Sequence, residues 1–156
     1  MTLAFDPTTV IASDLAGTPS SDLGNVEWSD GVAYRLVKAA AEITSPAGKI
    51  LVTAATAGVP TWNVNTTTTA SNVLVAGVVP AGITATIASG SYFYIQVSGA
   101  ADMLASVTTT GGAIGTSTVA GSGLPTGASA AGQCGVNLAA ATAANGTSKV
   151  LLRGLI

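Results

Sequence analysis

The feature that most constrains this chain is a stretch of almost a hundred residues that carries a single charged side chain. Between Lys49 and Lys149 the only charged residue is Asp102, and charged residues make up 8% of the whole chain. A soluble domain usually draws about a quarter of its residues from this group, because charge keeps it hydrated and holds neighbouring copies apart. We therefore expect a chain that lies in a membrane, is sequestered in an assembly, or stays soluble through hydroxyl and amide groups alone.

A membrane location disagrees with the pattern of apolar residues. The longest apolar run, Val73 to Ile83, is broken by Pro80 and falls short of the roughly 20 residues that a spanning helix needs. A membrane β-barrel would need girdles of aromatic residues, which are 4% of this chain. Residues 1–31 contain no Lys or Arg, so the positive region of a secretory signal is missing. We expect a protein made in the cytoplasm and not bound to a membrane.

The length of 156 residues predicts one domain, preceded by an arm. Met1 to Gly24 is rich in Asp, Pro, Thr, Ser and Gly, and is interpreted as an extended arm with Val10 and Ile11 as a possible short strand. Residues 25–156 are expected to form a single β domain. Within it, residues 115–132 are low in complexity and are expected to form a long loop or an extended segment.

Short runs of β-forming residues alternate with turn signals at intervals of about ten residues. The expected strands are residues 33–38, 49–53, 61–64, 73–79, 83–87, 92–97, 103–107, 113–119 and 149–153. This rhythm predicts an all-β fold, a compact β-sandwich or barrel of short antiparallel strands with an extended N-terminal arm and a loop-rich C-terminal third. Leu138 to Ala144 is the one candidate helix, and a loop is a nearly equal alternative there.

Catalytic chemistry has few residues to draw on. Histidine, the usual proton carrier near neutral pH and a common metal ligand, is absent. Asp22, Glu27 and Asp30 form the nearest acidic cluster, but they lack the spacing of a calcium loop and are interpreted as a solvated turn. The lone Cys134 is interpreted as a small semi-buried apolar side chain. We expect no enzyme activity, no catalytic residue, no cofactor and no metal site.

A binding role has more candidates, although nucleic acid is an unsuitable partner because no basic block is present and the net charge is −2. Trp28 and Trp62 stand beside turn signals, where a tryptophan serves an interface or a core equally well. Phe5, Val10 and Ile11 lie in the arm, and an extended arm can add a strand to a partner's sheet. These five residues form the candidate interface. We expect the arm or residues 115–132 to lie across a neighbouring subunit.

Two passages give the chain a resemblance to a known group of proteins. They are Val75 to Pro80, and Ile87 to Gly99 with its aromatic run Tyr92-Phe93-Tyr94, followed by a small-residue turn and Met103-Leu104. This order resembles small capsid-associated proteins of tailed bacteriophages. The upstream segments Gly31 to Ala39 and Pro46 to Lys49 fit the same pattern.

The resemblance implies a head decoration, or cement, protein on the exterior of the virion. Such a protein binds the outer surface of an icosahedral phage capsid and stabilises it by bridging subunits of the major capsid protein, commonly as a homotrimer. Binding summed over many copies needs no acid, base or cofactor. The alternatives are another virion part such as a tail or head-fibre base, a bacterial surface or adhesin module, and a small hydrolase with a serine nucleophile.

Overall fold

The computed structural model describes residues 5–12, 22–56, 59–67, 74–105, 111–116, 121, 123–126, 133–139 and 146–153. These residues contain β-strands and no α-helix, which confirms the predicted all-β class. The strands are β1 (Val10–Ile11), β2 (Val26–Ser29), β3 (Val32–Ala39), β4 (Ile50–Thr56), β5 (Val59–Asn65), β6 (Val75–Val78), β7 (Tyr92–Ala105), β8 (Ala113–Thr116), β9 (Gly123–Thr126), β10 (Gln133–Ala139) and β11 (Gly146–Leu152).

The first half of the chain forms a closed five-stranded mixed barrel. β3 pairs in parallel with β5, β5 pairs with β4, β4 with β6, β6 with the first half of β7, and that half pairs back with β3. Alternate residues of these strands, including Val37, Leu51, Phe93 and Ile95, are fully buried in the interior. β2 extends the sheet beyond β3, and β1 pairs with the start of β7.

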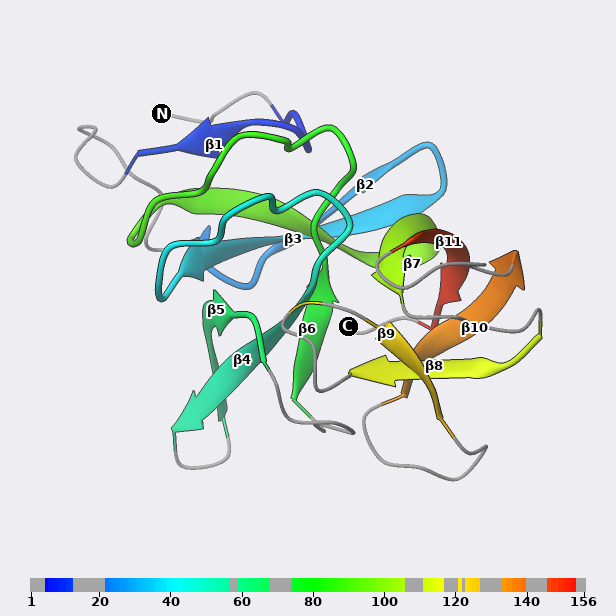
Figure 1. The fold of residues 1–156 in the computed structure, drawn as a ribbon. Coiled ribbons are helices and arrows are strands. Elements are labelled where there is room, and N and C mark those ends of the chain that lie inside the picture. Colours follow the sequence, from blue (N-terminus) through cyan, green and yellow to red (C-terminus); the bar gives the residue numbers. More distant parts are fainter. Residues whose placement is uncertain are drawn as a thin grey trace.

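The second half of β7 begins another ring of strands. It pairs in parallel with β9, β9 pairs with β8, β8 with β10, β10 with β11, and β11 pairs back with β7. Figure 1 shows β8 to β11 gathered on one side of the molecule and β1 to β6 on the other. We call β3 to β6 with residues 92–98 the first unit, and residues 99–105 with β8 to β11 the second unit.

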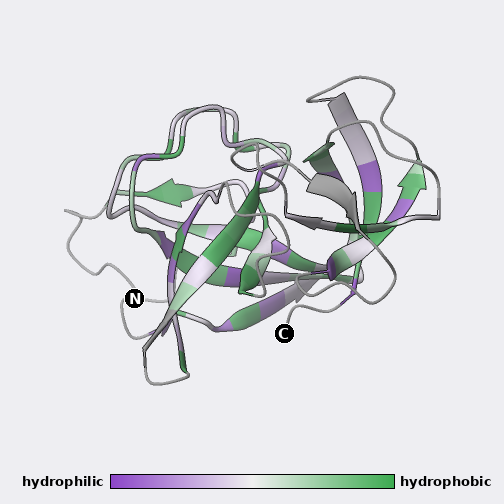
Figure 2. Cartoon of the chain, turned by 60° about the horizontal axis from the view of Figure 1, so that its bottom comes forward, coloured by the Kyte–Doolittle hydropathy of each residue, from purple (hydrophilic) through white to green (hydrophobic). Residues whose placement is uncertain are grey.

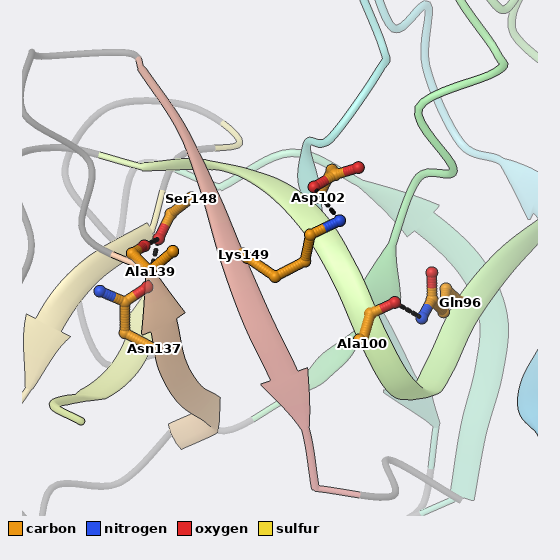
Figure 3. Close-up of polar contacts among 7 residues, drawn as sticks. All are labelled: Gln96, Ala100, Asp102, Asn137, Ala139, Ser148 and Lys149. Carbon is orange, nitrogen blue, oxygen red and sulfur yellow. Dashed lines mark hydrogen bonds and ion pairs between the residues drawn. The ribbon is translucent and has the colours of Figure 1, made fainter. Parts of the chain in front are cut away.

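β7 passes from one unit to the other through a bend at Gly99, whose φ of +86° favours glycine. The Gln96 side-chain amide, which is buried, donates to the carbonyl of Ser98 at 3.2 Å and to that of Ala100 at 2.9 Å. Figure 3 shows the second of these bonds. One side chain therefore satisfies two backbone carbonyls of the bend. A buried carbonyl without a hydrogen-bond donor would destabilise the fold.

The two units have the same strand order, the same strand directions and the same register. The corresponding register pairs are Leu51–Gly77 and Ile114–Gly135, Thr53–Val64 and Thr116–Gly123, Arg35–Ile95 and Ala101–Val150, and Val78–Gln96 and Val136–Leu151. A bulge also recurs at one place, at Ala76 in β6 and at Cys134 in β10. The chain is thus a tandem repeat of one five-stranded unit, with β7 shared.

Local details follow the same repeat. Gly48 and Gly111 precede the second strand of their units with φ of +71° and +79°. Gly48 N–H donates to the carbonyl of Val79 at 3.0 Å, and Gly111 N–H donates to the carbonyl of Asn137 at 2.7 Å. Because Val79 and Asn137 are equivalent in register, both units lock the same loop against the same strand in the same way.

At one pair of equivalent positions the core is apolar in the first unit and polar in the second. Val79 and Phe93 fill the first unit, whereas the equivalent Asn137 and Ser148 are buried in the second. The Ser148 hydroxyl bonds the Asn137 side chain and lies 2.7 Å from the carbonyl of Ala139, as Figure 3 shows. A buried polar pair that satisfies itself in this way avoids the cost of unpaired groups.

Several predicted elements need correction. Residues 83–87 form no strand and make only one bridge, between Ile87 and Ile43. The strands predicted at 92–97 and 103–107 are parts of one strand, β7, which ends at Ala105 in the described chain. Two pairings, β3 with β5 and β7 with β9, are parallel, so the sheet is mixed and not purely antiparallel.

The predicted helix at Leu138 to Ala144 is wrong where the structure describes it. Leu138 and Ala139 belong to β10, and residues 140–144 lie outside the described residues. β10 is paired on both sides, with β8 and with β11, so sheet hydrogen bonds outweigh the weak helix propensity of alanine. Within residues 115–132, the described parts belong to β8 and β9, apart from Gly121.

Candidate interaction surface

Trp28 is the most exposed of the five candidate interface residues. It lies in β2, which among the described strands pairs only with β3, and its side chain is 62% exposed. A large exposed aromatic side chain on an edge strand is available to a partner. An interface role for Trp28 remains a prediction.

Trp62 lies inside the fold of the first unit. Its half-buried indole packs against the first core and stands 4.0 Å, measured to the ring centroid, from the guanidinium carbon of Arg35. Arg35 is 4% exposed, and burial lowers the pKa of its guanidinium. Its Nε donates to the carbonyl of Gly24 at 3.3 Å. The cation–π contact and this bond hold the segment before β2 against the barrel.

The arm residues contact the outer face of the first unit. Val10 and Ile11 pair with Phe93 and Tyr92, which makes them a strand, β1, as the sequence suggested. Val10 is 37% exposed, whereas Ile11 is buried against Leu36 and Tyr92. The described part of the arm therefore packs on its own chain, and whether it also contacts a neighbouring subunit remains a prediction.

Phe5 completes an aromatic group on the same face. Its ring centroid lies 5.5 Å from that of Tyr34 and 4.9 Å from that of Tyr94, the second contact being edge-to-face. Burial, with Asp30 nearby, raises the pKa of Tyr34. Burial likewise raises the pKa of Tyr94, with smaller contributions from acidic neighbours. Both phenols therefore stay neutral at physiological pH.

Few charged groups face one another in the described chain. Lys149 and Asp102, opposite each other on β11 and β7, form an ion pair with Nζ 2.6 Å from Oδ1, and both are nearly half exposed. Figure 3 shows this pair reaching between β11 and β7. In Figure 2 the hydrophilic residues appear as short separate bands along largely apolar or neutral strands.

Sites for small molecules are poorly developed in the described residues. A pocket of about 60 Å³ is lined by Ala47, Gly48, Ala81, Asp102, Leu104 and Thr147, whereas ligand pockets usually occupy about 300–1,000 Å³. Within the described ranges, no three His, Cys, Asp or Glu side chains come together as a metal site, and Asp22, Glu27 and Asp30 make no such set. No described helix is long and apolar enough to cross a bilayer.

Cys134 occupies the bulge position of the second core. It is fully buried, its thiol lies 3.3 Å from the carbonyl of Ile114, and burial raises its pKa to about 12. A thiol with so high a pKa is a poor nucleophile. The side chain acts as the small apolar residue that the sequence indicated.

The sequence analysis did not identify two exposed leucines on the second unit. Leu138 in β10 is 46% exposed and Leu151 in β11 is 44% exposed. The alternation within Lys149 to Leu152 could have indicated that Leu151 points outward, because Val150 and Leu152 on either side are buried. The helix predicted at Leu138 to Ala144 gives no indication that Leu138 lies in a strand and points outward.

Comparison with known proteins gives a likeness of fold to a solved structure. No family model matches the chain, and no curated protein matches it in sequence. The fold is similar to the crystal structure of the head fiber gp8.5 N base in bacteriophage phi29, with a TM-score of 0.54 and 12% sequence identity. The match covers 78% of this chain and 94% of that chain. At this level of identity the likeness is one of fold.

Proposed function

We propose that this chain is a structural protein of a phage head, and that it serves as a base that seats an external component on the shell. The observation that carries the proposal is the likeness of fold to a head fiber base, which extends over 94% of the chain in that structure. The resemblance of Val75–Pro80 and Ile87–Gly99 to capsid-associated phage proteins supports it from the sequence.

The surface of the chain suits such a role. A protein that packs among many copies and host subunits gains from a surface with little charge, because like charges held close together repel. In residues 99–105 and β8 to β11 the charged side chains are Lys149 and Asp102, which pair with each other, and exposed Arg153 follows β11. Attachment through many identical copies replaces tight binding by any one copy.

The partners proposed are the major capsid protein and further copies of this chain, assembled as a homotrimer on the outside of the virion. The fold comparison favours a head-fibre base over the cement protein that the sequence suggested. The two roles differ in what they do to the shell. A cement protein strengthens the shell by bridging its subunits, whereas a base needs only to attach.

An experiment on purified heads tests both parts of the proposal. Heads from a phage that lacks the gene are mixed with the purified chain and sedimented, and we expect saturable binding to the pellet. The temperature at which the heads release their DNA is then measured with and without bound protein. An unchanged temperature supports a base, a higher temperature supports a cement protein, and failure to bind refutes both.

A further inference from the structure

The contact between the two units buries one row of side chains of the first unit. Ile50, Val78 and Gln96 stand side by side across β4, β6 and β7, since Ile50 pairs with Val78 and Val78 with Gln96. Their exposed fractions are 1%, 1% and 7%. Ile50 and Val78 belong to the core cluster that includes Met103 and Val150 of the second unit. The outer wall of the first unit is thus covered by the second unit.

The equivalent row of the second unit is open. Ala113, Val136 and Leu151 stand side by side across β8, β10 and β11, and Leu151 pairs onward with Ala100 of β7. Leu151 is 44% exposed, and Ala113 and Val136 are only half-buried. Leu138, at 46% exposed, adds to the apolar surface beside Val136.

The open row continues the covered one. Ala100 follows the bend of β7, and its carbonyl accepts the bond from Gln96, the last member of the covered row. The two rows therefore form one band that crosses from the interface between the units onto the free face of the second unit. All four residues of the open row are apolar, although a solvated sheet face usually carries polar side chains.

The repeat indicates what kind of surface fits this band. In the first unit the row is covered by another unit of the same architecture. On the open face Lys149 and Asp102 form an ion pair at 2.6 Å, and Arg153, two residues beyond Leu151 in the chain, is also exposed. A second copy of the same chain offers the same exposed apolar row.

We propose that the row Ala113, Val136, Leu151 and Ala100, with Leu138 beside it, is the surface through which copies of this chain contact one another. This inference rests on the self-association proposed above and adds its location. Around a threefold axis the same row from three copies meets at the centre. Exposed apolar side chains of this size contribute to association when they are covered.

The mass of the protein in solution tests the location. Wild type, Leu151→Lys and the matched control Val59→Lys are compared by sedimentation over a range of concentrations; Val59 is an apolar strand residue of the first unit and is 65% exposed. We expect a trimer for wild type and for Val59→Lys. Leu151→Lys should weaken the trimer at least about tenfold, because it places like charges together at the contact. A Leu151→Lys protein that keeps the wild-type mass overturns the proposal.

Cross-linking gives a second readout with a variant that preserves the apolar surface. Leu151→Cys introduces one accessible thiol, because Cys134 is buried. A short bismaleimide should join Leu151→Cys chains and leave Val59→Cys chains unlinked, and the reverse result contradicts the proposal. Head binding is measured separately. A monomeric wild type that binds heads overturns this inference alone, whereas a trimer that ignores heads supports it and overturns the proposed function.

Discussion

Substituting two equivalent glycines, one in each unit, is the sharpest test of the tandem repeat. Gly77 in β6 and Gly135 in β10 each stand where a Cβ would meet the backbone of the next strand. An added Cβ would lie 2.6 Å from the carbonyl oxygen of Gln96 at the first position, and 2.5 Å from that of Leu151 at the second. Real Cβ atoms do not approach oxygens so closely, and a carbonyl in a paired strand cannot turn aside. The strands would have to separate.

The expected cost of Gly77→Ala or Gly135→Ala follows from these distances. Overpacking that forces backbone shifts costs about 1–3 kcal/mol, and the lower entropy of the unfolded alanine chain offsets about 0.4–1 kcal/mol. We expect each change to lower the free energy of unfolding by about 1–2 kcal/mol. At about 2–4 °C per kcal/mol for a chain of this size, the melting temperature should fall by about 2–8 °C.

Urea and thermal unfolding followed by circular dichroism measure both variants. Gly82→Ala is the control, because its Cβ would meet only the side chain of exposed Thr8, at 2.7 Å, and that side chain can rotate away. We expect the control to stay within about 0.5 kcal/mol of wild type. The reasoning is refuted if Gly77→Ala and Gly135→Ala also stay within that range, or if only one of them loses stability.

Three further predictions concern single features. Cys134 should not react with a thiol reagent in the folded protein, because it is buried. Its folded pKa of about 12 exceeds the unfolded value of about 9, so the contribution of the neutral thiol to the free energy of unfolding is fully present below pH 9 and is lost as the pH rises further. Urea unfolding at a series of alkaline pH values measures this loss. Breaking the exposed ion pair by Asp102→Asn should change the free energy of unfolding by less than about 1 kcal/mol in urea melts. Deleting Met1 to Gly24 should reduce co-sedimentation with heads, and undiminished binding would exclude the arm as the attachment segment.

The class of fold was predictable because it depends on short-range patterns. Strands β3, β4, β5 and β11 follow runs of β-forming residues bounded by Gly, Pro, Ser or Asn, and their predicted positions agree with the structure within a few residues. β10 was not predictable in this way, because alanines beside Leu138 favour a helix locally. Pairing with two neighbouring strands decides its conformation, and that information lies elsewhere in the chain.

The tandem repeat is not evident in the sequence, because the two units share their strand pairing but few identical residues. The equivalent positions keep the same residue where geometry demands it, as at Gly48 and Gly111 with positive φ, and at Gly77 and Gly135 where no Cβ fits. Most other equivalent residues differ, and loops of different length separate the strands. A search of the sequence for a fixed period therefore fails, and only the strand pairings reveal the two units.

The sequence indicates that a binding surface would be apolar and aromatic, but it does not indicate which of these side chains are exposed. Trp28 is exposed on an edge strand, but Trp62 packs on Arg35 inside the fold, and neighbouring turn signals do not distinguish these two environments. The outward direction of Leu151 follows from the alternation of β11, but which strands β11 joins is known only from its pairings with β7 and β10. Such positions become evident only when distant strands are placed together.

The most direct test of the proposed role is the composition of purified phage particles. Mass spectrometry of gradient-purified particles measures the copy number of this chain relative to the major capsid protein. We predict a fixed and reproducible number of copies per head, retained after extensive washing. Particles without the chain, from a lysate in which it is abundant, would contradict the account.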